Sequence, residues 1–411
     1  MGATLGTAVN QPTAVPGHAR LAVRRLTLTD FRCYQALRFE NDGSPVVLVG
    51  PNGAGKTNLL EAISCLAPGR GLRRARLSDI ACRRRPVVGQ TVSDAESAPR
   101  WAVAAEIDGA FGPVSLGVGW ASAGEDGKEK RETRIDGQPI GNQSALSEHI
   151  GVVWLTPAQD RLFIEAPAGR RQFLDSLVFA FDPAHAGRVQ AFDKGRRDRT
   201  KLLREGRADA VWLAAVERGM AERAVAIAAA RLDLVARLAA EISAADGPFP
   251  KPLVEVRGLL ENWLLAMPAL DVEERYRARL EADRPTDAEA GTAQGPHRSD
   301  LWAALGPGGP EAAQASTGEQ KAVLIAMVLA HGRLLTRLRG AAPVMLLDEV
   351  VAHLDGARRA ALFESIRSMG AQVWLTGTES ELFAPLRDMA QMFLVKDANL
   401  TITPNEEWPR G

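Results

Sequence analysis

Residues 50–57, Gly-Pro-Asn-Gly-Ala-Gly-Lys-Thr, fit the P-loop pattern that holds the phosphates of a nucleoside triphosphate. The segment follows an apolar run at residues 45–49 and precedes helical spacing at residues 58–66, which is the context that a P-loop needs. Its glycines let backbone N–H groups turn inward, where the positive end of the following helix also favours phosphate. Lys56 is expected to reach the β and γ phosphates, and Thr57 to offer its hydroxyl to Mg²⁺. The predicted ATP-binding residues of this segment are Gly50, Pro51, Asn52, Gly53, Ala54, Gly55, Lys56, Thr57 and Asn58.

Two adjacent carboxylates follow an apolar strand much later in the chain, at residues 344–349. Asp348 is expected to hold Mg²⁺, and Glu349 to polarise the attacking water, a role worth about 10² to 10⁴ in rate. The alternative is that two acids merely cap the end of a strand. The wide separation from the P-loop indicates an inserted domain, the plan of ABC-type ATPases, in which both ends of the chain build one head. The predicted catalytic residues are therefore Lys56, Asp348 and Glu349.

A third motif, Ala-Ser-Thr-Gly-Glu-Gln at residues 315–320, precedes a long helix. Ser316 or Thr317 is suited to cap that helix, with Glu319 completing a capping box. The serine, the bare Gly318 and the helix N-terminus also form an anion site, and the motif stands where ABC ATPases have their signature. Ser316, Thr317 and Gly318 are then expected to contact the γ-phosphate that a second copy binds, which predicts an ATP-dependent homodimer.

The elements that position these motifs fall into three parts. Residues 21–180 favour mixed α/β structure, with strands at 21–31, 36–39, 45–49, 101–107 and 114–120 and a polar stretch at 121–129. Residues 181–290 are rich in Ala, Arg, Leu and Glu, and apolar spacing at 211–242 predicts a helical arm followed by a polar linker at 283–295; a bundle that serves packing alone is the alternative. In residues 291–411 a helix at 356–368 separates strands at 344–347 and 373–375, so a parallel sheet is expected. The predicted fold class is α/β, an ABC-type P-loop ATPase head built from both ends of the chain with an inserted helical arm, after a disordered leader at residues 1–20.

Bulk composition limits the function classes. The 411 residues contain 46% hydrophobic and 24% charged side chains, as in an ordinary globular protein. Fifty basic and fifty acidic side chains cancel, so any attraction to nucleic acid must come from local clusters. The three cysteines show no metal-binding spacing, and no apolar run approaches the roughly 18 residues of a membrane helix. We expect a cytoplasmic protein with no membrane partner.

Two basic clusters are candidates for contact with DNA phosphates. Aromatic residues make up only 5% of the chain, so backbone contact is expected rather than base stacking. The second cluster is the weaker candidate because acidic residues interleave with it. The first cluster comprises Arg70, Arg73, Arg74 and Arg76 with the arginines at 83–85, and the second comprises Arg196, Arg197, Arg199, Lys201, Arg204 and Arg207.

Several blocks in order along the chain resemble the RecF family of recombination-repair proteins, small relatives of the SMC ATPases. The blocks are residues 26–34, 58–63, 167–175 and 295–300, together with the motifs above. The resemblance implies a head that dimerises around two ATP molecules and binds double-stranded and gapped DNA. It also implies work with RecR and RecO in loading RecA, in gap repair and the SOS response. His297, Arg298 and Asp300 in the last block are expected to be structural.

The resemblance also assigns roles to single residues. Gln159 corresponds to the Q-loop residue that senses Mg²⁺ and the γ-phosphate, with an ordinary surface glutamine as the alternative. Asp355 is similar to the D-loop acid that acts across the dimer, and Arg32 is expected to reach the nucleotide. Thr376-Gly-Thr378 has no histidine at the switch position, which favours slow hydrolysis used as a timer. The rival functions are the nucleotide-binding subunit of an ABC transporter and a protein-interaction platform.

Overall fold

The computed structural model describes residues 21–82, 100–109, 112–121, 131–205 and 209–409. Several sequence predictions lie outside the described residues: the leader, most of the polar stretch at 121–129, the arginines at 83–85 and Arg207. Among the described residues, no helix combines the length and the apolar character that crossing a membrane requires.

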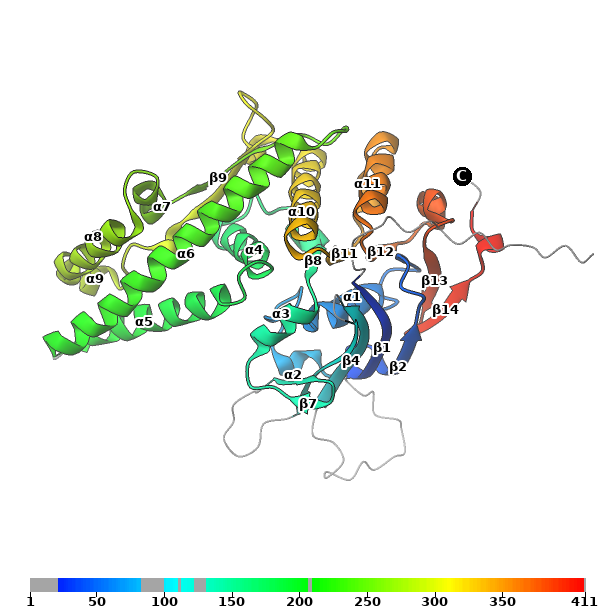
Figure 1. Cartoon of the computed structure of the whole chain (residues 1–411), viewed down its shortest axis with the longest axis horizontal. Coiled ribbons are helices and arrows are strands. Elements are labelled where there is room, and N and C mark those ends of the chain that lie inside the picture. The colour runs from blue at the N-terminus through cyan, green and yellow to red at the C-terminus, as the bar shows by residue number, and fades with distance from the viewer. Residues whose placement is uncertain (1–20, 83–99, 110–111, 122–130, 206–208, 410–411) are drawn as a thin grey trace, which may run out of the picture.

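The central sheet of the head is assembled from both ends of the chain, as Figure 1 shows. Its parallel strands run in the order β13-β3-β12-β11-β8, and β14 adds an antiparallel edge. The predicted head architecture is confirmed. The strands are β3 (Val46–Val49), β8 (Val152–Leu155), β11 (Val344–Leu347), β12 (Val373–Gly377), β13 (Gln391–Lys396) and β14 (Asn399–Thr403).

A second, antiparallel sheet in the order β2-β1-β4-β5-β6-β7 covers one face of the central sheet. The fully buried Gln372 joins the two sheets: its Oε1 accepts from Val23 N at 2.8 Å, and its Nε2 donates to Val23 O at 3.0 Å. The strands are β1 (Ala22–Phe31), β2 (Tyr34–Glu40), β4 (Arg100–Gly109), β5 (Gly112–Ala121), β6 (Glu132–Ile135) and β7 (Gln138–Pro139).

Helices cover the central sheet according to the two-residue alternation of its strands. Val46 and Leu48 pack with α1 and the second sheet, whereas Val47 and Val49 pack with α10 and α11 on the opposite face. α1 therefore lies between the two sheets, directly after β3. The helices of the head are α1 (Lys56–Cys65), α2 (Leu77–Ile80), α3 (Leu146–His149), α4 (Pro167–Phe179), α10 (Thr317–Arg339) and α11 (Gly356–Met369).

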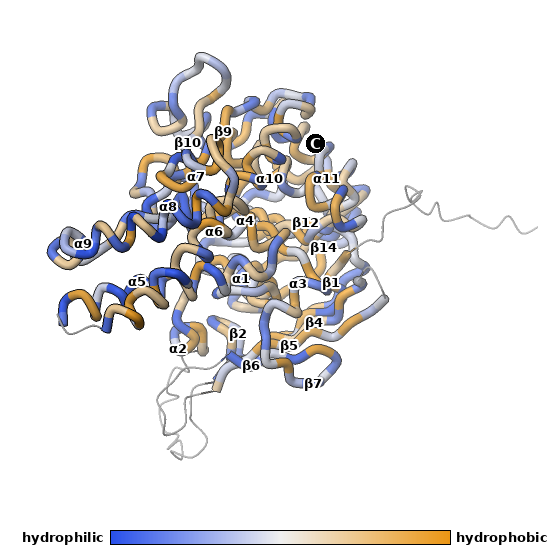
Figure 2. The backbone as a smooth tube through the Cα atoms, turned by 60° about the vertical axis from the view of Figure 1, so that its left-hand side comes forward, coloured by the Kyte–Doolittle hydropathy of each residue, from blue (hydrophilic) through white to orange (hydrophobic). Residues whose placement is uncertain are grey.

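The arm projects from the head and has a core of its own (Figure 1). α6 spans both parts, since Met220 and Ala224 pack within the arm while Leu238 and Ile242 pack against the head. Figure 2 shows hydrophilic colouring along α8 and much of α5. The elements of the arm are α5 (His185–Glu205), α6 (Ala210–Ala244), β9 (Leu253–Arg257), α7 (Leu259–Leu264), α8 (Ala269–Ala282) and α9 (Arg284–Ala290).

Two elements differ from the sequence predictions. β9 is a strand inside the range predicted to be helical, and it pairs antiparallel with β10 (Asp300–Ala304). Its five residues alternate in burial, but a stretch so short is stabilised by its distant partner rather than by its own pattern. The stretch predicted as a linker contains α9, which has a proline in its first turn and ends at Gly291 with φ 70°. That proline and glycine placement is a helix signal that the sequence contained.

Candidate nucleotide site

The P-loop joins β3 to α1 in a conformation that requires glycine. Gly53 and Gly55 have φ of 81° and 113°, the left-handed region that residues with a Cβ avoid. A Cβ on Gly55 would also approach within 2.6 Å of the Tyr34 hydroxyl, and one on Gly50 would collide with the carbonyl oxygen of Val395. The Tyr34 hydroxyl donates to Gly55 O at 3.2 Å, and burial raises the pKa of Tyr34, so it remains a donor at neutral pH. β2 and β13 thus lie against the loop.

Lys56 and Thr57 begin α1 with their side chains turned toward the loop and the Walker B strand, β11. The Lys56 ammonium donates to Gly50 O at 2.6 Å and to Pro51 O at 3.0 Å. Burial lowers the pKa of Lys56, while the carboxylates of Glu349 and Asp348 oppose the shift. The Thr57 hydroxyl lies 3.0 Å from each carboxylate oxygen of Asp348. The two ends of the chain meet at this contact.

Thr376, at the end of β12, completes the Walker B corner. Its hydroxyl donates to Asp348 Oδ1 at 2.7 Å and accepts from the backbone N–H of Glu349 at 2.9 Å. Glu349 has φ of 53°, which is unfavourable for a residue with a side chain, and the contact to Thr376 helps to hold it there. Sequence reasoning missed this role and considered the switch position only for its lack of histidine. The available signal was a hydroxyl residue at the end of the strand beside the Walker B strand.

The Q-loop follows β8, which pairs with β11. The Gln159 side chain accepts from Thr156 N at 2.7 Å and closes a capping box, so in this structure it faces its own turn. The neighbouring Asp160 lies 3.3 Å from the ammonium of Lys321, a buried lysine on α10. The same ammonium donates to Glu349 O at 3.4 Å, which links the Q-loop, the signature helix and the Walker B turn. The sequence analysis did not single out Lys321 or Asp160.

The signature motif caps α10 and faces solvent. Ser316 Oγ accepts from Glu319 N at 3.3 Å, and the Glu319 carboxylate accepts from Ser316 N at 2.9 Å, which is the predicted capping box. The Ser316 hydroxyl and backbone N–H hold the pKa of Glu319 below its usual value. Ser316, Thr317 and Gly318 are exposed, and a Cβ on Gly318 would meet nothing within 4 Å. Asp355 is likewise exposed and caps α11 by accepting from Arg358 N at 2.8 Å.

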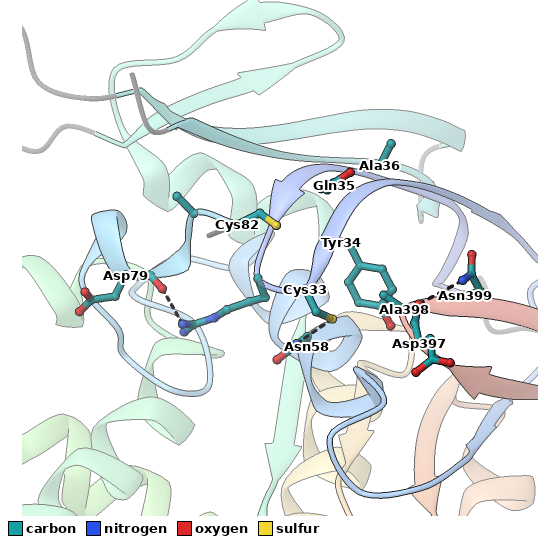
Figure 3. Close-up of a pocket in the computed structure, with 12 residues that line it drawn as sticks. Cys33, Tyr34, Gln35, Ala36, Asn58, Asp79, Cys82, Asp397, Ala398 and Asn399 are labelled. Atoms are coloured by element: carbon teal, nitrogen blue, oxygen red, sulfur yellow. Dashed lines mark hydrogen bonds between the residues drawn. The ribbon is translucent and has the colours of Figure 1, made fainter. Parts of the chain in front are cut away.

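A cavity of about 760 Å³ opens beside the P-loop, between the turn after β1 and the β13–β14 turn (Figure 3). Asn58, next to Thr57, lines it, and its amide donates to the sulfur of Cys33 at 3.1 Å. Arg32 forms part of the wall and has φ of 53°. Its guanidinium holds the buried carboxylate of Glu61 through two hydrogen bonds of 2.9 and 2.5 Å. Arg32 therefore stands at the cavity, anchored to α1.

The family model for the RecF/RecN/SMC N terminal domain matches residues 22–401. The DNA replication and repair protein RecF of Rhizobium etli (strain CIAT 652) is 45% identical over 385 residues, which are 93% of this chain and 99% of that protein. The same protein of Mesorhizobium japonicum is 46% identical over 392 residues, 95% of this chain and 99% of that protein. The chain belongs to the RecF family.

Solved structures show the RecF fold over nearly the whole chain. One described as the recombination mediator protein RecF-ATP in the RecFOR pathway superposes with a TM-score of 0.76 at 19% identity and covers 95% of this chain and 100% of that chain. An Smc head bound to the C-winged helix domain of ScpA gives a TM-score of 0.50 at 16% identity, with 93% and 97% covered. These likenesses establish the ATPase head fold of the RecF and SMC proteins. Nothing in these matches favours the transporter alternative.

The RecF-like blocks that are far apart in the sequence meet at the joint between head and arm. Arg170 on α4 holds the Asp300 carboxylate through hydrogen bonds of 2.7 and 2.9 Å, and the neighbouring Arg171 donates to Ser299 O at 2.9 Å. This ion pair agrees with the structural role expected for Asp300. One turn further along α4, the Asp175 carboxylate accepts a hydrogen bond from Arg231 Nε of α6 at 2.9 Å. It also lies 2.8 Å from His185 Nε2 of α5. Burial opposes the ionisation of Asp175, but His185 and Arg231 outweigh burial and lower its pKa.

The two basic clusters have different environments. Arg70, Arg73, Arg74 and Arg76 are all exposed, although Arg73 is tied to Asn58 at 2.7 Å and to Glu61 at 2.9 Å. In the second cluster, Arg199 is 1% exposed and binds Glu217 at 2.8 Å and Asp287 at 2.7 Å. Its prediction as a DNA contact is wrong, because this arginine holds α5, α6 and α9 together inside the arm.

Proposed function

We propose that this chain is an ATP-dependent DNA replication and repair protein that acts as a dimeric clamp on duplex DNA at single-strand gaps. Relatives named as DNA replication and repair proteins support this function. The observation that carries the clamp is the contrast between two halves of the nucleotide machinery. The P-loop and Walker B side chains meet within one chain, whereas the signature lies at an exposed helix N-terminus. A triphosphate at Lys56 is then completed by Ser316 and Gly318 of a second copy.

The side chains at the site fit ATP with Mg²⁺. Hydroxyl and carboxylate oxygens are ligands that Mg²⁺ accepts, and those of Thr57 and Asp348 lie 3.0 Å apart. When bound, Mg²⁺ neutralises charge on the phosphates. Thr57 and Asp348 would hold the ion, and Lys56 would contact the phosphates. Gln159, in the turn after the neighbouring strand β8, is assigned as a further contact to the ion. The cavity beside Asn58 has the size of ordinary ligand pockets, and we assign it to the base and ribose.

Glu349 is assigned as the group that orients water and accepts its proton. It follows Asp348 at the end of β11, and its backbone N–H is held by Thr376 at 2.9 Å. The switch segment at the end of β12, Thr376-Gly-Thr378, has no histidine, and from this we infer slow turnover. We further propose that DNA stimulates it. Slow hydrolysis then sets how long the closed dimer stays on DNA. Asp355 is assigned to the interface between the two copies.

DNA and the other partners complete the proposal. The exposed Arg70, Arg73, Arg74 and Arg76 contact the phosphate backbone. The clamp works in the cytoplasm with RecR and RecO and assists RecA loading, in replication gap repair and the SOS response. A solved RecF described as part of the RecFOR pathway supports this set of partners.

The deciding experiment measures molecular mass by sedimentation with and without ATP. Wild type is expected to become dimeric with ATP, and Ser316→Arg to stay monomeric because it blocks the signature. Ser316→Asp keeps the helix cap but places a negative charge against the partner's γ-phosphate, so it is also expected to stay monomeric.

The matched control is Ser368→Arg, since Ser368 is exposed on α11, away from the signature. It should dimerise as wild type does. An ATP-dependent dimer that forms equally well in both Ser316 variants would contradict the sandwiched nucleotide.

A further inference from the structure

A second cavity, of about 410 Å³, lies between the head and the arm. Its walls come from the segment after α1 and from α4, α5, α6 and the turn at Pro296–Arg298. Four arginines and two aspartates line it. We refer to it as the head–arm cleft. Its charged lining residues are Arg74, Arg171, Arg196, Arg231, Asp175 and Asp193.

The positive charge in the head–arm cleft is only partly balanced. The hydrogen bonds of Asp175 in this cleft go to Arg231 and His185, and its charge also acts on Arg74 and Arg171. One carboxylate is therefore shared among three arginines. Asp193 lies 3.6 Å from Arg196 Nε, and that nitrogen is buried without a hydrogen bond in the described part of the chain. Arg171 donates one hydrogen bond, to a backbone carbonyl. Unmatched guanidinium groups at one cavity form an anion site.

Arg74 has the strongest indication of a role in this cleft. Within the described residues, no hydrogen bond or ion pair holds its side chain, and its φ is 53°. Among the described residues, and apart from glycines and aspartates, this left-handed backbone is shared by Arg32 and Glu349, both at the nucleotide site, and by Ala398, which lines the adjoining cavity. Such strain persists where function requires it. Here the backbone of Arg74 places its guanidinium at a cleft that three other arginines also line.

The electrostatics of the cleft favour an anion. Burial lowers the pKa of Arg171, the nearby Arg231 lowers it further, and the carboxylates of Asp300 and Asp175 oppose the shift without cancelling it. Burial, with Arg196 and Arg298, lowers the pKa of His297 to about 4, so this ring is neutral at physiological pH. Its Nδ1 is buried and makes no hydrogen bond among the described residues. An added anion would offset the mutual repulsion of these arginines.

We propose that the head–arm cleft binds one phosphate group of a nucleic acid strand, held chiefly by Arg74, Arg171 and Arg196. The volume of the cleft, about 410 Å³, accommodates a phosphate group, and guanidinium forks match the paired oxygens of phosphate. This inference rests on the proposed function and narrows its DNA contacts, because Arg73 is committed to α1. Arg73 also connects the cleft to the proposed nucleotide site, since it donates to Asn58 beside Thr57 and precedes Arg74 in the chain.

The test is the affinity for fluorescent gapped duplex DNA at several salt concentrations with ATP present. Arg74→Gln is expected to weaken binding about tenfold and to reduce the slope of log affinity against log salt by about one, the value for one lost phosphate contact. Arg74→Lys keeps the charge and should retain the wild-type slope. Arg277→Gln, at an exposed arginine on α8, is the matched control and should bind as wild type does.

Arg74→Gly separates function from folding. Glycine adopts this backbone without strain, so its melting temperature should equal or exceed that of wild type while its DNA affinity falls as in Arg74→Gln. Wild-type affinity and slope in both variants would overturn the cleft site but leave the clamp intact.

Two further outcomes are also decisive. Absence of DNA binding by wild type in every nucleotide state would overturn both the clamp and the cleft site. Inorganic phosphate, titrated alone at constant ionic strength, tests the other source of the anion. Binding of inorganic phosphate that requires Arg74, combined with DNA affinity that does not, would overturn the assignment to nucleic acid.

Discussion

At the scale of single residues, the catalytic corner depends on hydroxyl groups that orient carboxylates. Asp348 is 3% exposed and is bordered by Thr57 on one side and Thr376 on the other. A buried carboxylate without such donors is costly, since each lost partner leaves a desolvated charge. Thr376 contacts both acidic residues, because its hydroxyl donates to the Asp348 carboxylate and accepts from the backbone N–H of Glu349. The second contact fixes the backbone that carries the Glu349 side chain. It is a positioning residue rather than a catalytic one.

Thr376→Val is expected to lower ATP turnover about tenfold or more while nucleotide affinity changes little. The methyl group removes the hydrogen bond to Asp348 and releases Glu349 N, at a cost of about 1 to 3 kcal/mol of stability. Phosphate release measures the turnover, and nucleotide titration measures the affinity. Thr376→Ser keeps the hydroxyl and should behave as wild type does; equal loss in both variants would argue against the hydrogen bonds.

At the scale of elements, the joint between α4 and α10 buries a titratable group. His331 on α10 is 1% exposed and hydrogen bonds to Leu177 O on α4 at 2.9 Å. Burial lowers the pKa of His331 to about 4, against 6.5 in the unfolded chain. The unfolded state therefore binds more protons between these values. Stability is fully present above pH 6.5 and is lost as the pH falls toward 4.

His331→Gln is expected to reduce the acid sensitivity of the fold. The amide keeps a donor for Leu177 O but has no proton to take up, so it removes up to about 3 kcal/mol of the pH dependence between 6.5 and 4. Denaturant unfolding at a series of pH values measures this. His353→Gln, at an exposed histidine, is the control. The same decline with pH in the His331 variant would assign acid lability to other groups.

At the scale of the whole molecule, each head brings its P-loop and its Walker B strand together and presents its signature motif to solvent. α10 connects them, because it begins at the exposed Ser316 and places Lys321 against the Q-loop and Glu349 O. In the proposed dimer, a second copy that engages the signature would thus be linked to the Walker B turn through buried contacts of the same chain. The arm extends from this head through α6, with the head–arm cleft at its base.

Glu349→Gln is expected to trap the closed dimer. Without the proton acceptor, hydrolysis should fall about 10² to 10⁴-fold while ATP binding and dimerisation persist. Sedimentation after ATP removal should show a long-lived dimer, and gapped DNA should stay bound longer than with wild type. Glu364→Gln, at an exposed acid on α11, should release DNA at the wild-type rate. Faster release from the Glu349 variant would contradict the timer.

The local motifs of this chain were predictable because each one is defined by neighbouring residues. The P-loop needs glycines at left-handed positions before a helix, and the signature needs a cap and a bare glycine, so residues 50–57 and 316–319 reveal both. Runs of apolar residues predicted β3, β11 and β12, since strands buried on both faces must be apolar. The separation of the P-loop from Asp348 by a helical segment indicated a head built from both ends.

The partners of charged and polar side chains required the tertiary structure. Arg74 and Arg199 belong to similar basic runs, yet one is exposed at a cleft and the other is buried against Glu217 and Asp287. β9 likewise exists because β10 lies beside it. Residues that are distant in the sequence decide whether a charged side chain is buried and whether a short strand forms. The sequence alone therefore determined the chemistry of the motifs. Only the tertiary structure decided which arginines remain available to a ligand.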